Sequence, residues 1–219
     1  MLSKFFIPWV FIGFYFVTGC NLIEPSGVLS SYDDLRQTPP ISLSNEDQRL
    51  NAGLRKTKLK LGTLYQFNNP DEILSIKEIS KTYITWQSSL GHEYVTVKNP
   101  FVPAVTWYEN INSVVGRRSI SNTKGSLFPL KTGGKISFQV DGIGLGGTSA
   151  WRKFWSCKAN GKTTIKLWDD EVVWKVTCTS NSGEVIVHYY SEEIGLVVKT
   201  VTSEQGKEVS RELTAMQAG

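Results

Sequence analysis

The sequence contains few of the residue patterns that most enzymes and nucleic-acid-binding proteins depend on. Its 219 residues include only two histidines, His92 and His188, which have no cysteine or paired carboxylates at ligand spacing, so we predict no metal site. Lysine and arginine number 24 against 20 acidic residues. Because this excess is small and no basic stretch is interleaved with aromatic residues, we expect no nucleic-acid partner.

The motifs of common catalytic sites are also absent. No serine lies in a Gly-x-Ser-x-Gly elbow. The acidic clusters Asp169–Glu171 and Glu192–Glu193 fall in expected turns, where adjacent carboxylates are usually solvated. The glycine spacing in Gly142–Gly147 matches a dinucleotide-binding fingerprint. That fingerprint binds phosphates through the amides of a helix N-terminus, whereas we expect a strand to follow here. We therefore expect no catalytic activity and no cofactor, with an enzyme of unrecognised type as a rival hypothesis.

The one strongly apolar run, Phe5–Val17, contains Pro8 and is shorter than the about 20 residues that a membrane-spanning helix needs. It follows Lys4 and leads through small residues to Cys20. Residues 1–19 thus resemble a bacterial lipoprotein signal peptide, which is cut just before its cysteine. The resemblance implies that Cys20 carries a diacylglyceryl group and an amide-linked acyl chain such as palmitate, enough to anchor a protein on a bilayer.

The residue after this cysteine bears on the membrane that holds the anchor. It is Asn21, whereas an Asp at this position commonly retains such lipoproteins at the inner membrane. The resemblance therefore implies the outer membrane, with the protein facing the periplasm, in preference to the inner membrane.

The chain after the signal divides by composition. Residues 20–45 are rich in serine and proline and poor in apolar residues, which predicts a lipidated tether. Residues 46–79 are predicted to lead in to the domain, with a short helix capped by Ser44 or Asn45 and a short strand around the alternating Lys56–Lys60. Residues 80–216 are predicted to form a β-rich periplasmic domain.

Beyond Lys81 the apolar residues recur with a period of two and are often β-branched or aromatic, which predicts strands. Asn160-Gly161 is the strongest hairpin signal between them. No long helical pattern intervenes, so we predict a mainly β fold, an antiparallel sheet curled into a sandwich or a half-open barrel. The expected strands are Tyr83–Trp86, Tyr94–Val97, Ala104–Tyr108, Lys135–Val140, Trp151–Cys157, Thr163–Trp168, Val172–Cys178, Val185–Tyr190 and Leu196–Val201.

With Cys20 lipidated, Cys157 and Cys178 remain as a pair, which predicts a disulfide in an oxidising compartment. Two buried free thiols are the alternative. A meander of strands 151–159, 162–168 and 171–178 would separate the two cysteines laterally by about 9.5 Å, whereas a disulfide tolerates Cα separations of up to about 7 Å. Either the strands that bear Cys157 and Cys178 are direct neighbours, or the bond does not form.

Four tryptophans in the second half of the chain are candidates for a ligand or partner surface, because aromatic faces stack on carbohydrates, lipid chains and proteins. We favour the alternative that they belong to the core, since Trp151 and Trp155 share strand parity with Cys157. The four residues are Trp151, Trp155, Trp168 and Trp174.

Several segments resemble, in the same order, a family of small secreted or lipidated proteobacterial proteins that are mostly uncharacterised. The resemblance covers roughly residues 80–201, departs from the family at Glu192, where relatives often have proline, and implies a shared fold but no transferable activity. The segments are Ile84–Trp86, Lys98–Pro103, Ser126–Gly133, Trp155–Cys157, Lys175–Cys178 and Tyr189–Lys199.

We therefore expect a membrane-anchored periplasmic lipoprotein that acts as a binding or envelope-assembly module, with an envelope protein or a lipid as its partner. A carrier of lipid or another hydrophobic ligand is the first alternative, and it predicts a long apolar cavity inside the β domain.

Overall fold

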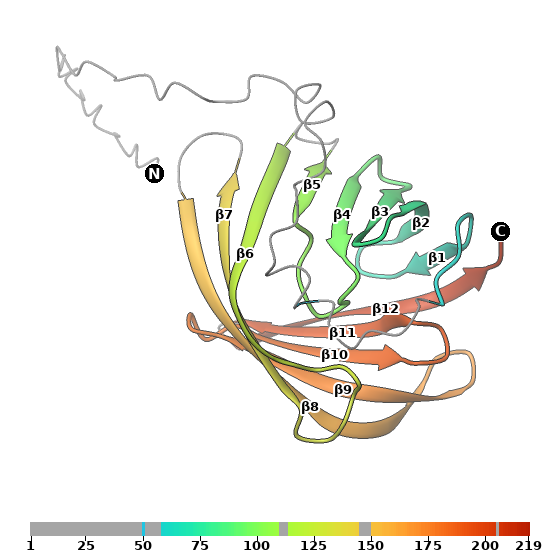
Figure 1. Cartoon of the computed structure of the whole chain (residues 1–219). Coiled ribbons are helices and arrows are strands. Elements are labelled where there is room, and N and C mark those ends of the chain that lie inside the picture. The colour runs from blue at the N-terminus through green and yellow to red at the C-terminus, as the bar shows by residue number, and fades with distance from the viewer. Residues whose placement is uncertain (1–49, 51–57, 110–113, 145–149, 205) are drawn as a thin grey trace, which may run out of the picture. The chain divides into compact units, whose positions relative to one another are not determined.

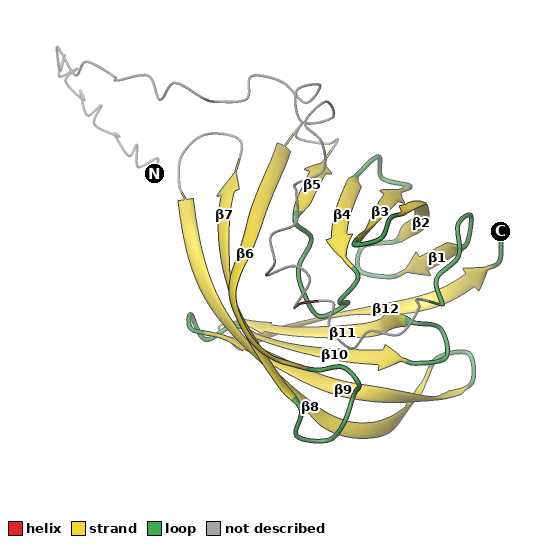
Figure 2. Cartoon of the chain, viewed as in Figure 1, coloured by secondary structure: helices red, strands yellow, loops and turns green. Residues whose placement is uncertain are grey.

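The computed structural model describes residues 50, 58–109, 114–144, 150–204 and 206–219, which all lie in one compact unit, Pro40–Gly219. These residues form twelve strands, each antiparallel to the next in sequence, and β12 pairs with β1 to close a barrel (Figures 1 and 2). The strands are β1 (Leu64–Phe67), β2 (Glu72–Ile79), β3 (Tyr83–Ser88), β4 (Glu93–Val97), β5 (Thr106–Glu109), β6 (Val114–Ser126), β7 (Lys135–Gly144), β8 (Ala150–Lys166), β9 (Asp170–Ser180), β10 (Val185–Ser191), β11 (Leu196–Glu204) and β12 (Lys207–Gln217).

The predicted mainly β, antiparallel fold is confirmed, and its strands follow the expected period of two. In β3, Ile84, Trp86 and Ser88 are buried and alternate with more exposed residues. In β8, Trp155 and Cys157 are buried and are flanked by exposed neighbours. Alternation of this kind places one face of each strand in the barrel interior.

The prediction of a hairpin at Asn160-Gly161 is wrong. β8 continues through this dipeptide to Lys166, and the pairing register with β9 shifts between Ala159 and Gly161. Gly161 has φ of 132°, a backbone conformation that side chains rarely permit, so here the glycine serves a bulge within a strand. The predicted separate strand Thr163–Trp168 is therefore mostly the second half of β8, and the chain turns at residues 167–169.

The long β8 also resolves the geometry of the cysteines. With no third strand between them, β8 and β9 are direct neighbours, and Cys157 lies opposite Cys178 in the ladder. The two residues form the predicted disulfide, and both are buried in the core.

Four strands lie outside those that the sequence predicted. β6 and β12 are rich in serine, lysine, arginine or glutamate, and β1 and β2 lie within residues 46–79, the expected lead-in. β1 and β2 nevertheless pair with β12 and β3 and complete the ring.

The signal, the tether and the predicted helix after Ser44 lie outside the described residues, apart from Leu50. No described segment forms a helix long and apolar enough to cross a membrane.

The buried apolar side chains form two clusters. The larger one includes the disulfide and packs between β4, the loop after it and β6–β10, while the other collects residues of β1–β3 and β9–β12. Asn99, in the segment Lys98–Pro103, is almost fully buried, and its Nδ2 donates a hydrogen bond of 2.9 Å to the carbonyl oxygen of Leu50. This bond joins Leu50 to the loop after β4, which also lines the pocket described below.

Candidate functional site

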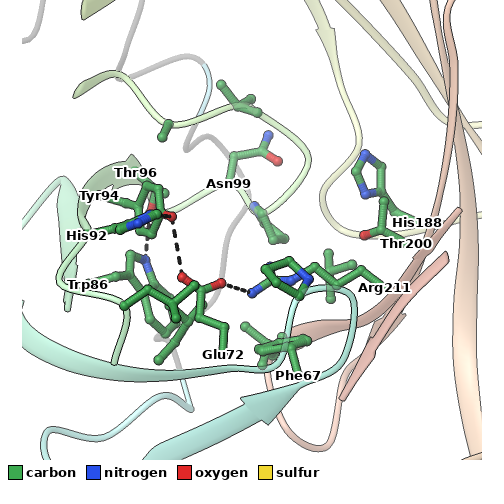
Figure 3. A pocket seen from close by; sticks show the side chains of 18 residues that line it. Phe67, Glu72, Trp86, His92, Tyr94, Thr96, Asn99, His188, Thr200 and Arg211 are labelled. Atoms are coloured by element: carbon green, nitrogen blue, oxygen red, sulfur yellow. Dashed lines mark hydrogen bonds and ion pairs between the residues drawn. The ribbon is translucent and has the colours of Figure 1, made fainter. Parts of the chain in front are cut away.

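A pocket of about 470 Å³ opens inside the barrel, between the short strands β1–β4 on one side and β10–β12 on the other (Figure 3). The pairing register places residues of neighbouring strands side by side at the pocket. Phe67 of β1 lies opposite Glu72 of β2. Thr200 of β11 lies opposite His188 of β10 on one side and Arg211 of β12 on the other. The lining residues are Phe67, Pro70, Glu72, Leu74, Trp86, Leu90, His92, Tyr94, Thr96, Asn99, Pro100, Val102, Ala104, His188, Leu196, Val197, Thr200 and Arg211.

Most of this lining is apolar or aromatic. Leu74, Leu90 and Val102 contribute aliphatic surface from β2 and the loops after β3 and β4, and Leu196 and Val197 contribute it from β11. Such a wall favours the apolar part of a ligand, because burying apolar surface is the main favourable term in binding.

A buried ion pair lies in the same pocket. Glu72 is only 5 % exposed, and its Oε2 accepts a hydrogen bond from Nη2 of Arg211 at 2.5 Å. Ser88 and Tyr94 donate their hydroxyls to Oε1 of Glu72, at 2.5 and 3.3 Å. The Arg211 guanidinium carbon also lies 4.2 Å from the centroid of the Phe67 ring. Glu72 thus has a counter-charge and two further donors, as a carboxylate needs when it is removed from water.

The two histidines line opposite sides of the pocket (Figure 3). Nδ1 of His92 lies 2.9 Å from the hydroxyl of Tyr94, so His92 extends the network that begins at Glu72. His188 packs against Phe101 with 5.8 Å between ring centroids. Burial lowers the pKa of His188 from 6.5 to about 4, so this imidazole is neutral at pH 7.

Three buried nitrogen atoms of lining residues have no hydrogen-bond partner among the described residues. They are Nε2 of His92, Nδ1 of His188 and Nε of Arg211. Buried polar atoms in native proteins are almost always paired, and unpaired ones gather where a ligand or solvent supplies the partner. Three such atoms around one cavity make this pocket the candidate binding site.

The lowered pKa of His188 predicts a pH dependence of stability. Because the unfolded chain takes up this proton near pH 6.5 and the folded protein only near pH 4, the contribution of the neutral ring is lost as the pH falls through that window. We expect urea unfolding to show a smaller loss of stability between pH 7 and pH 4.5 in His188→Gln than in the wild type. Equal losses in the two proteins would contradict this expectation.

The structure separates the four tryptophans of the predicted surface. Trp155 and Trp174 are buried in the larger core cluster, and Trp151 packs against that cluster. Trp168 is 48 % exposed after the end of β8. None of the four is among the described residues that line the pocket. Cys20, the expected lipidation site, lies outside the described residues.

The central residues of the pocket were not singled out from the sequence. Glu72 follows the turn Asn68–Asp71, and Arg211 lies in the polar strand β12, which was not predicted. The sequence signal that could have identified Arg211 is the alternation of Val209, Arg211 and Leu213, in which a charged residue shares strand parity with apolar ones.

Among the described residues, no group of three or more His, Cys, Asp or Glu side chains is arranged to hold a metal ion.

Comparison with known proteins finds a solved structure with partial similarity. No protein-family model matches the sequence, and no curated protein matches it. The structure is similar to the crystal structure of the hypothetical lipoprotein YmcC from Escherichia coli K12, with a TM-score of 0.47 and 15 % sequence identity, over 78 % of this chain and 88 % of that chain.

Proposed function

We propose that the chain is a periplasmic lipoprotein whose barrel binds a small amphipathic molecule, without catalysing a reaction. The anchor would be the acyl chains on Cys20, and Asn21 supports the outer membrane as its place. Residues 20–45 would serve as the tether between the membrane and the barrel.

The pocket is the observation that carries this proposal. Its volume of about 470 Å³ lies in the range of about 300–1,000 Å³ typical of small-molecule sites. It combines an apolar wall with a few convergent polar groups, the arrangement by which such sites bind and orient their ligands. This cavity favours the carrier function over an assembly module, which would depend on a partner surface.

The test is mass spectrometry of the intact protein, purified gently from its own membrane after crosslinking in the cell. We expect acyl groups on Cys20 and a noncovalently bound small molecule in a monomer. An unmodified Cys20 would contradict the anchor, and an empty barrel with a stoichiometric protein partner would support the assembly module instead.

A matched pair of variants assigns the bound molecule to the pocket. Thr200→Trp places a large side chain in the pocket and should abolish co-purification of the molecule. Thr179→Trp makes the same change at an exposed position of β9 and should leave the amount of co-purified molecule unaltered. Equal retention by both variants would show that the molecule binds elsewhere, and circular dichroism checks that both variants fold.

A further inference from the structure

The charge of the pocket restricts the chemistry of its ligand. Apart from the histidines, the only ionisable residues among its described lining are Glu72, Arg211 and Tyr94, and the first two form an ion pair. The pocket therefore carries one negative and one positive charge in direct contact. On the basis of the proposed function, we propose that this pocket selects an uncharged amphiphile whose head carries hydroxyl groups.

A charged head would lack a counter-charge in this site. The Glu72 carboxylate already accepts from Arg211, Ser88 and Tyr94. An anion would compete with Glu72 for Arg211, and a cation would compete with Arg211 for Glu72. Either one would leave a buried charge uncompensated, which is among the most unfavourable events in a protein interior.

The unpartnered nitrogens indicate which neutral groups the head carries. Arg211 Nε always bears a proton and can only donate. Because the Tyr94 hydroxyl donates to Glu72, it accepts from Nδ1–H of His92, and in that tautomer of the imidazole Nε2 is an acceptor. A ligand must therefore accept at one point and donate at another, and a hydroxyl group does both. A carboxylate has no proton to donate, and a quaternary ammonium group can do neither.

The other side of the pocket fits the same class of ligand. His188, neutral because burial lowers its pKa to about 4, adds a third nitrogen, Nδ1, that either donates or accepts according to its tautomer. The aliphatic side chains Leu74, Leu90, Leu196 and Val197 line the remainder and would contact the apolar chain of the ligand.

Three probes with the same eight-carbon chain test the proposal: 1-octanoylglycerol, octanoate and octyltrimethylammonium. Binding to the full-length protein in lipid nanodiscs is measured by equilibrium dialysis, with empty nanodiscs as the blank. We expect 1-octanoylglycerol to bind at least about tenfold more tightly than either ion, since only the ions leave a charge unpaired.

Two substitutions should change this selectivity in opposite directions. Glu72→Gln leaves Arg211 without its counter-charge and should raise the affinity for octanoate relative to 1-octanoylglycerol. Arg211→Gln leaves Glu72 unpaired and should do the same for octyltrimethylammonium. Circular dichroism checks the folding of both variants. If either variant does not fold, the comparison of the three probes on the wild type still tests the selectivity.

The outcomes separate this inference from the proposed function. If octanoate or octyltrimethylammonium binds the wild type as tightly as 1-octanoylglycerol, and Thr200→Trp abolishes that binding, the selectivity is wrong although the pocket binds ligands. If Thr200→Trp changes the binding of none of the three probes, the pocket is not a site for amphiphiles, and both proposals fail.

Discussion

Replacing Arg211 with methionine is expected to destabilise the folded domain by about 3 kcal/mol, because Glu72 would remain buried without its counter-charge. Glu72 is 5 % exposed, and its Oε2 lies 2.5 Å from Nη2 of Arg211. Methionine keeps an unbranched apolar side chain against the Phe67 ring, so the substitution removes chiefly the charge. Urea unfolding followed by circular dichroism at pH 7 measures the change.

The matched control is the pair Lys77–Glu93, whose charged atoms lie 2.8 Å apart but whose side chains are 52 % and 21 % exposed. Lys77→Met should cost only about 0–1 kcal/mol, as is typical of surface ion pairs. The double variant Glu72→Gln/Arg211→Met should recover much of the loss. Similar effects of Lys77→Met and Arg211→Met would show that burial does not govern the strength of the Glu72 pair.

Replacing both Cys157 and Cys178 with alanine is expected to destabilise the domain by about 3 kcal/mol, because the open chain gains conformational entropy when it unfolds. The disulfide joins residues separated by 21 positions, and both side chains are almost completely buried. For a domain of this size, the loss should lower Tm by roughly 6–12 °C. Thermal unfolding with and without a reducing agent measures the effect.

The reducing agent also supplies the control for this prediction. Once the disulfide is reduced, the wild type should approach the Tm of the double variant, and the double variant should not respond to reductant. A wild-type Tm that stays the same after complete reduction would mean that the crosslink contributes nothing to stability.

The strands that the sequence predicted are those rich in apolar, β-branched and aromatic residues, such as Tyr83–Trp86 and Val185–Tyr190. β6 and β12 were missed because polar residues occupy both faces of these strands in many places. In β12 the reason is visible in the pocket, where Arg211 occupies an inward position that would be apolar in a filled barrel.

The Asn160-Gly161 dipeptide shows a second limit. The same two residues suit a tight hairpin turn and a bulge, since both need a glycine where φ is positive. In the structure β8 pairs with β9 on both sides of Gly161, so the dipeptide forms a bulge within the strand and not a turn. Local sequence carries no information on how far that pairing extends.

The sequence by itself determined the antiparallel β class and offered Cys157 and Cys178 as a candidate pair, because the period of two and an even pair of cysteines are local or compositional signals. The structure decided that the two cysteines bond, because it makes β8 and β9 direct neighbours. Only the tertiary structure decided the candidate site. Glu72 and Arg211 are 139 residues apart in the chain, and they meet because β12 pairs with β1 and closes the barrel. Such a contact depends on strand order and register around the whole ring, which no segment of the sequence specifies alone.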